Sequence, residues 1–106
     1  MPDYLFLREG TTYTKIPLDD IYYLQADGNY AYIQTKFRRF AVKRSLATIS
    51  EDLDPNQFVR CSRGILVNFP QVDVVSFADG VIQLGEHRLK LGKAYHADIK
   101  ARMPRL

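Results

Sequence analysis

The sequence contains no tryptophan, one cysteine and two histidines among its 106 residues. The single cysteine, Cys61, excludes an internal disulfide and any zinc site built from several cysteines, and His87 and His96 do not make up the deficit. No run approaches the roughly 20 apolar residues that a membrane-spanning helix needs, and the N-terminus lacks the basic start of a signal peptide. We therefore expect a cytoplasmic protein in a reducing compartment.

Catalytic motifs are also missing. The sequence has no nucleophile elbow, no glycine-rich phosphate loop and no histidine pair at metal-ligand spacing. Asp19 and Asp20 are neighbours, and adjacent residues of a strand point to opposite faces, so a turn or strand entry explains them better than a paired catalytic site. Cys61 lies in an apolar and basic stretch that suits a spectator thiol better than a reactive one. We expect neither an enzyme nor a cofactor or metal site.

Charge is unevenly distributed along the chain. Residues 1–35 carry two basic and five acidic side chains, whereas residues 36–106 carry thirteen basic and seven acidic ones, which is −3 followed by +6. This segregation indicates a polyanionic partner, and the alternative is a surplus of solvated lysine and arginine.

Period-two patterns dominate the sequence. In residues 29–36 the side chains of Tyr30, Tyr32 and Gln34 share one face, and those of Ala31, Ile33 and Thr35 share the other. Strands are predicted at residues 4–8, 11–16, 21–26, 29–36, 37–43, 58–67, 72–77, 81–84 and 87–91. The turns between them include Glu9-Gly10, Asp27-Gly28, Asp79-Gly80 and Gly85-Glu86, and we expect Asp27-Gly28 to form a type I′ turn.

Helical spacing occurs in two places. Leu46, Ile49 and Leu53 follow Ser45, a plausible N-cap, and precede Pro55, which predicts one short helix. Residues 93–103 are predicted as a possible C-terminal helix. The fold class is therefore mainly β, with small antiparallel sheets, in a single domain over residues 1–106.

The most informative stretch is the run Phe58-Val59-Arg60-Cys61-Ser62-Arg63-Gly64-Ile65-Leu66-Val67-Asn68. It resembles the central motif of LytTR-type DNA-binding domains. The resemblance extends upstream to residues 16–24, Asp27-Gly28-Asn29-Tyr30 and Ser45-Leu46, and downstream to Leu89-Lys90-Leu91-Gly92-Lys93-Ala94-Tyr95. It covers roughly residues 10–103 in matching order and spacing.

The resemblance implies small sheets stacked into an elongated body whose loops enter two successive major grooves of duplex DNA and the minor groove between them. By match to the family's contact segments, Asn29, Tyr30 and Ala31 fall in the first DNA-facing loop, Arg63 with Ser62 in the second, and Lys93 with Ala94 in the third. Lys43 and Arg44 match positions that face the phosphate backbone. Asn68 completes the candidate set, with a mainly structural role in the turn before Pro70.

Side-chain chemistry supports several of these roles. Arg63 can bond guanine or enter a narrow minor groove, with a surface salt bridge as the alternative. Asn29 can read adenine or serve the turn, and Tyr30 can bond a phosphate or pack on the sheet. Lys93 suits a phosphate or a guanine if it begins a helix.

The sequence departs from the family pattern at five positions. Glycine replaces the usual serine at Gly64 and Gly92, Ser62 stands where histidine is frequent, and Ala31 and Ala94 stand where polar residues are common. The lost hydroxyl groups predict fewer phosphate contacts and an altered target sequence, and the fold is expected to persist because no apolar core position changes.

Two other classes of function stay open. The first is a small all-β module that binds protein or a second messenger. The second is a single-stranded nucleic-acid binder in which Tyr22, Tyr23, Tyr30 and Tyr32 stack bases.

In the LytTR family the module follows a receiver or sensory domain, for which this chain has no room, so we expect an excised domain or a minimal regulator. We also expect a monomer in solution that pairs on direct repeats of duplex DNA.

Overall fold

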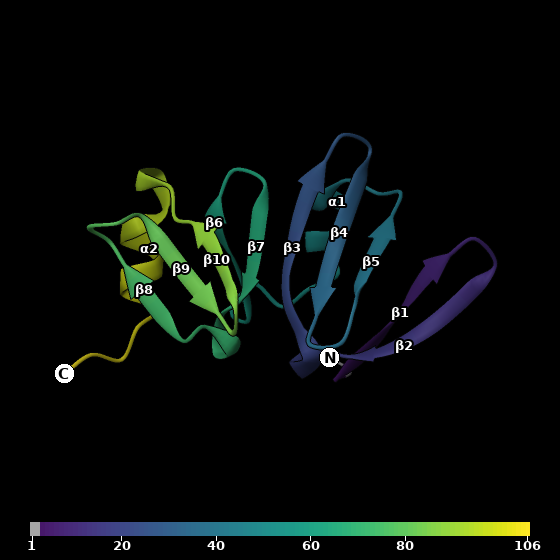
Figure 1. Cartoon of the computed structure of the whole chain (residues 1–106), viewed down its shortest axis with the longest axis horizontal. Coiled ribbons are helices and arrows are strands. Elements are labelled where there is room, and N and C mark those ends of the chain that lie inside the picture. Colours follow the sequence, from purple (N-terminus) through teal and green to yellow (C-terminus); the bar gives the residue numbers. More distant parts are fainter. Residues whose placement is uncertain (1–2) are drawn as a thin grey trace.

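Residues 3–106 form ten short strands in three antiparallel sheets, with two short α-helices and three 3-10 turns (Figure 1). The computed structural model describes residues 3–106. The strands are β1 (Tyr4–Glu9), β2 (Thr12–Pro17), β3 (Ile21–Asp27), β4 (Tyr30–Thr35), β5 (Arg39–Val42), β6 (Phe58–Ser62), β7 (Ile65–Asn68), β8 (Val74–Ser76), β9 (Val81–Leu84) and β10 (His87–Lys90). The helices are η1 (Leu18–Asp20), α1 (Leu46–Ser50), η2 (Phe69–Gln71), η3 (Lys93–Tyr95) and α2 (His96–Ala101).

The sheets follow one another along an elongated body of 45 × 28 × 25 Å. A two-stranded sheet, β1-β2, lies at one end, a five-stranded sheet of order β5-β4-β3-β7-β6 lies in the middle, and a three-stranded sheet of order β10-β9-β8 lies at the other end. The predicted fold class, a mainly β domain of small stacked sheets with one short helix and a C-terminal helix, is confirmed.

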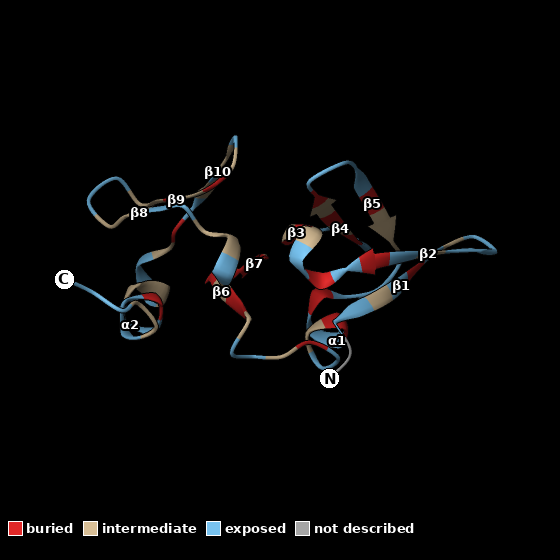
Figure 2. Ribbon diagram, turned by 90° about the horizontal axis from the view of Figure 1, so that it is seen from below, coloured by how far each residue is buried: buried red, intermediate tan, exposed pale blue. Residues whose placement is uncertain are grey.

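Two hydrophobic cores flank the central sheet. One includes Leu24, Ile33 and Leu66 together with α1 and the β1-β2 sheet, and the other includes Val67, Ile82 and Ile99 together with α2 and the three-stranded sheet. Figure 2 shows these halves side by side, with α1 in one and α2 in the other. Because β7 lies between both cores, its residues are buried on both faces, which explains its continuous apolar run.

The short helix α1 begins as the sequence predicts. The Ser45 hydroxyl accepts a hydrogen bond of 3.1 Å from the backbone N–H of Thr48, which satisfies one of the donors that a helix start leaves open. Leu46, Ile49 and Leu53 are all buried against the central sheet. The helical spacing of these three residues therefore reflects their packing.

Two predicted hairpin turns, Glu9-Gly10 and Asp27-Gly28, are displaced by one residue, whereas Gly85-Glu86 forms the β9–β10 turn as predicted. Glu9 pairs with Thr12 and Asp27 with Tyr30, so the two-residue turns are Gly10-Thr11 and Gly28-Asn29. Glycine occupies the first turn position with φ of +63° and +60°, and no other residue type among residues 3–106 has a positive φ. This arrangement is typical of type II′ turns, and the expected type I′ turn at Asp27-Gly28 is wrong.

Gly85 opens the β9–β10 turn with φ of +57°, and a Cβ there would lie 2.8 Å from the Tyr22 hydroxyl oxygen, whereas a Cβ at Gly28 has nothing within 4 Å. Both alanine variants are strained by positive φ, so we expect each to lower the free energy of unfolding by about 1–2 kcal/mol. Gly85→Ala should lose more because the Tyr22 ring must also move. Urea denaturation of both variants checks this, and a larger loss for Gly28→Ala would contradict it.

Candidate nucleic-acid interface

Three turns that carry predicted contact residues lie along one side of the body, at the top of Figure 1. They are the β3–β4 turn, the β6–β7 turn Arg63-Gly64 and the segment from β10 to α2, and we call this side the loop edge. Two backbone hydrogen bonds of 2.8 Å connect them, from Ala26 N–H to the Gly64 carbonyl and from Gly92 N–H to the Cys61 carbonyl. The loop edge is therefore one bonded surface assembled from distant parts of the sequence.

The first turn presents two of the predicted residues to solvent. Asn29 is exposed and has no positive φ, so the backbone does not require asparagine there for a left-handed conformation. Tyr30 is 44% exposed, and its ring centroid lies 6.5 Å from that of Tyr32. Both Asn29 and Tyr30 are therefore available to a ligand.

Ala31, unlike Asn29 and Tyr30, is not accessible to a ligand. Its side chain is 0% exposed and packs in the core on the α1 side of the central sheet, where Ala31 pairs with Val42 of β5. The structure thus corrects the assignment of Ala31 as a contact residue. The reason is the period of two, because Ala31 shares the inward face of β4 with Ile33.

The second turn carries Arg63. The pairing register of β6 with β7 shifts by one residue between Arg60 and Ser62, so Cys61 has no partner on β7. The Cys61 carbonyl therefore accepts the hydrogen bond from the Gly92 N–H. Arg60 donates to the Arg63 carbonyl and so braces the turn from beneath. Arg63 itself is exposed and forms no ion pair within residues 3–106, while Ser62 is half-buried beside it.

The third segment carries Lys93 and Ala94, both exposed, in the 3-10 turn η3 that continues directly into α2. Lys93 thus begins a helical segment, as predicted. It lines an open hollow with Lys90 and His96, and the His96 Nε2 atom is buried without a hydrogen-bond partner in the described residues.

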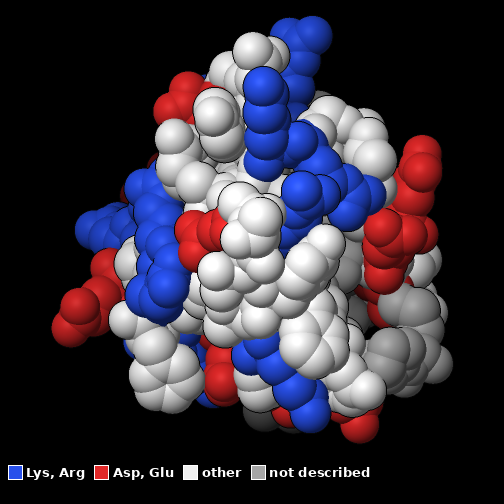
Figure 3. All heavy atoms as spheres, turned by 90° about the vertical axis from the view of Figure 1, so that its right-hand side faces the viewer, with Lys and Arg blue, Asp and Glu red and all other residues white. Residues whose placement is uncertain are grey.

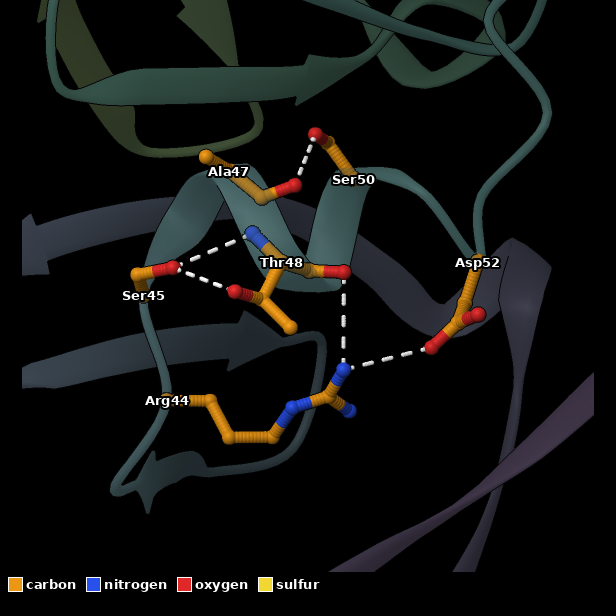
Figure 4. A network of polar contacts seen from close by, with 6 residues as sticks. All are labelled: Arg44, Ser45, Ala47, Thr48, Ser50 and Asp52. Carbon is orange, nitrogen blue, oxygen red and sulfur yellow. Dashed lines mark hydrogen bonds and ion pairs between the residues drawn. The ribbon is translucent and has the colours of Figure 1, made fainter.

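Lys43 and Arg44 follow β5 and differ in what they contact. Lys43 is exposed and lines a hollow together with Tyr30, beside the first turn. Arg44 turns toward α1, where its Nη2 atom lies 3.3 Å from an Asp52 carboxylate oxygen and 3.4 Å from the Thr48 carbonyl oxygen (Figure 4). Lys43 is therefore the better placed of the two cations for a phosphate.

Asn68 is a structural residue and not a contact residue. Its side chain is 0% exposed, and its amide nitrogen donates to the carbonyls of Leu18 at 2.9 Å and Ile21 at 2.8 Å. It joins the end of β7 to both ends of η1. Its buried side chain is not accessible to DNA, and it ties down η1, far away in the sequence, and not the predicted turn before Pro70.

Basic side chains are largely unpaired along this surface. The described residues contain three ion pairs, Arg38–Glu9, Arg44–Asp52 and Arg102–Asp98, and none includes Lys43, Arg63 or Lys93. Figure 3 views the β1-β2 end and shows Lys and Arg side chains at the top of the molecule, where the loop edge lies. The loop edge therefore favours an anion.

The other chemically distinctive residues are accounted for by packing. Cys61 is 0% exposed, and burial raises the pKa of its thiol to about 12, so at neutral pH it stays a protonated core residue. Asp19 and Asp20 lie in η1, as expected for a turn. Within residues 3–106, no group of three or more His, Cys, Asp or Glu side chains is placed to hold a metal ion, and no helix is long and apolar enough to cross a membrane.

The four tyrosines do not form one stacking platform. Tyr23 is 7% exposed and buried in the core on the α2 side, and both Tyr22 and Tyr23 pack against His87 with centroid distances of 5.5 and 5.4 Å. Tyr30 and Tyr32 are the accessible pair. This geometry disfavours a single-stranded nucleic-acid platform.

Sequence reasoning missed three polar residues beside the candidates. Lys90 and His96 share the hollow of Lys93, and the Arg39 guanidinium lies 4.2 Å from the Tyr32 ring centroid. The exposure of Lys90 could have been predicted from the alternating pattern of β10, in which Arg88 and Lys90 occupy the exposed positions. His96 carries no comparable signal because its environment depends on Phe77, nineteen residues earlier.

The chain resembles known proteins in sequence and in fold. The chain is 33% identical over 63 residues to the CO-responsive transcriptional regulator RcoM of Rhodospirillum rubrum, a match that covers 59% of this chain and 27% of that protein. The chain thus spans about a quarter of this curated relative. Its fold matches the solved structure of a LytTr DNA-binding domain from Bacillus cereus with a TM-score of 0.82 and 16% identity, over 99% of this chain and 100% of the other. The family model of the LytTr DNA-binding domain matches residues 11–103, and the chain belongs to that family.

Proposed function

We propose that this chain binds duplex DNA at specific sequences through the loop edge and acts in transcription regulation. The observation that carries the proposal is the bonded surface itself, in which three turns with exposed polar or cationic side chains are held in one arrangement by the Ala26–Gly64 and Gly92–Cys61 hydrogen bonds. The 45 Å long axis of the whole body is compatible with contacts in two successive major grooves, which lie roughly 34 Å apart in B-DNA.

Each exposed residue has a role suited to its chemistry. Arg63 reads guanine or a narrow minor groove, because a guanidinium fork matches the acceptors of guanine and no carboxylate competes for it. Asn29 bonds adenine in a major groove. Lys43 and Lys93 contact phosphates, and Tyr30 donates its hydroxyl to a phosphate or sugar oxygen. Ser62 and Ala94 flank these contacts and shape the two turns.

The proposal includes a biological setting. Because the RcoM relative is a regulator nearly four times as long as the matched segment, we infer that this chain serves as a DNA-binding output module controlled by a sensory or receiver domain, in the cytoplasm. No catalytic step is proposed.

We further propose that the domain is a monomer in solution and pairs on direct repeats. Sedimentation at micromolar concentration should give a single species of 12.2 kDa without DNA and a two-to-one complex on a duplex with two half-sites. A tight dimer in the absence of DNA would contradict this.

Lys43→Ala tests the phosphate contact. Loss of one lysine–phosphate contact should weaken all duplexes alike and reduce the slope of log K against log salt concentration by about 0.9. Fluorescence anisotropy over a range of salt concentrations measures both effects. Arg44→Ala is the matched neighbour and should change the slope less, because Arg44 is engaged with Asp52. A larger slope change for Arg44→Ala would reverse the assignment.

A further inference from the structure

An apolar cavity of about 330 Å³ lies beneath the β1-β2 sheet and shares Arg8, Val42 and Arg44 with the hollow that Lys43 and Tyr30 line. Its walls come from β1, the central sheet and α1. The deepest lining residues are aliphatic and almost inaccessible to solvent, with exposures of 1% for Ile21, 2% for Leu24 and 1% for Ile33. The cavity floor is therefore built entirely from the hydrophobic core.

The size of the cavity suits a small molecule. Binding pockets for small ligands begin at roughly 300 Å³, and an apolar cavity of about 150 Å³ stays dry and binds benzene. A space about twice that size accepts an apolar body of about eight to ten carbons. Water is not stabilised in this space, because the cavity floor offers it no hydrogen-bond partner.

The rim of the cavity carries charge. Arg8, Arg44 and Asp52 all line it. Asp52 is paired with Arg44 at 3.3 Å, as Figure 4 shows. Arg8 has no carboxylate partner within residues 3–106; its Nε donates to the Gly10 carbonyl at 2.7 Å, its guanidinium lies near the Tyr13 ring, and its two Nη groups form no ion pair. Two guanidinium groups thus face one carboxylate, which leaves an excess positive charge at the opening.

We propose that this cavity binds a medium-chain monocarboxylic acid, with the apolar chain against Ile21, Leu24 and Ile33 and the carboxylate at the Arg8 guanidinium. An arginine fork donates two parallel hydrogen bonds to a carboxylate, and burial of each CH₂ group of an apolar tail adds to the affinity. This site rests on the lining of the cavity and does not depend on the proposed DNA function.

The test uses the free domain and three eight-carbon probes, octanoate, octanol and octylammonium. Methyl carbon–proton NMR spectra are recorded while each probe is added. We expect octanoate to shift the methyl signals of Ile21, Leu24, Ile33 and Leu53 to saturation, octanol to shift the same signals at higher concentration, and octylammonium to bind more weakly than either.

Two variants distinguish the contribution of the apolar tail of the ligand to affinity from that of its carboxylate. Ile49→Phe adds bulk at the cavity wall and should weaken octanoate and octanol alike by at least tenfold. Arg8→Gln should weaken octanoate about three- to tenfold and leave octanol unchanged. Because Arg8 lies at the rim, its substitution should leave the fold intact, which the unchanged remainder of the methyl spectrum verifies.

Several results would overturn the proposal. Shifts that do not saturate, or that scatter over the surface, would mean that the cavity does not bind octanoate. If octylammonium bound as tightly as octanoate, or if Arg8→Gln lowered the affinity for octanol as much as that for octanoate, the cavity would not select a carboxylate.

Discussion

Arg63→Ala will weaken binding to the preferred duplex by about 1–3 kcal/mol and will relax discrimination at one position of the site. The reason is that Arg63 is exposed at the tip of the β6–β7 turn and forms no ion pair within the described residues, so its donors are available to a base edge. The turn itself should survive, because it is held by backbone bonds from Ala26 and by the Arg60 side chain. Fluorescence anisotropy with the preferred duplex and its single-base variants measures the effect.

A matched control removes the same charge elsewhere. Arg105 is exposed near the C-terminus, which Figure 1 places away from the loop edge. Arg105→Ala should change affinity for all duplexes only slightly and leave base discrimination intact. If Arg63→Ala loses the same free energy on preferred and scrambled duplexes, Arg63 contacts phosphate and is not a base reader.

Asn68→Ala will lower the free energy of unfolding by about 2–4 kcal/mol. The substitution removes the Asn68 donor from the Ile21 carbonyl and one of two donors from the Leu18 carbonyl, which keeps its bond from the Ile21 N–H, and a buried acceptor left unsatisfied costs about 1–3 kcal/mol. It also opens a small cavity at a side chain that is 0% exposed. Thermal and urea denaturation measure the loss, which should lower the melting temperature by more than about 10 °C.

Asn56→Ala is the control for this prediction. Asn56 is exposed in the segment between α1 and β6, so its substitution should change stability by less than about 0.5 kcal/mol. At temperatures where Asn68→Ala stays folded, its affinity for DNA should equal that of the unaltered chain. Normal stability with lost DNA affinity would instead make Asn68 a contact residue.

Local patterns in the sequence predict the strands and helices well. Alternating residues identify β4, and Ser45 with Leu46 and Ile49 identifies α1, because these signals depend on near neighbours in the chain. The same alternation already placed Ala31 on the face of Ile33, so its burial was predictable without the structure. The assignment of Ala31 to a contact loop followed position in the family motif and ignored this pattern.

Long-range partners explain what the sequence could not reveal. Asn68 bonds the carbonyl of Leu18, fifty residues away, and no local pattern identifies that pairing. Arg44 forms an ion pair with Asp52 because the fold around α1 brings the two side chains together. The turn type at Gly28-Asn29 was also beyond local reasoning, because the pairing of Asp27 with Tyr30 follows from the register of the whole sheet.

The connection between the three turns is the most consequential feature of this kind. Ala26 and Gly64 lie far apart in the sequence, as do Cys61 and Gly92, and each pair is joined by one backbone hydrogen bond. The register shift at Cys61 makes the second bond possible by releasing a carbonyl from the sheet. The sequence shows the residue types for DNA contact, and the packing of the sheets brings them to one edge.

Sequence-specific duplex binding is tested most directly by selection from a random duplex library at near-physiological salt, followed by comparison of the selected duplex with a scrambled duplex and with its single strands. We predict enrichment of a repeated motif, a steep fall in affinity with salt, and much weaker binding of the scrambled duplex and the single strands. No enrichment, or a preference for single strands, would contradict the proposed function.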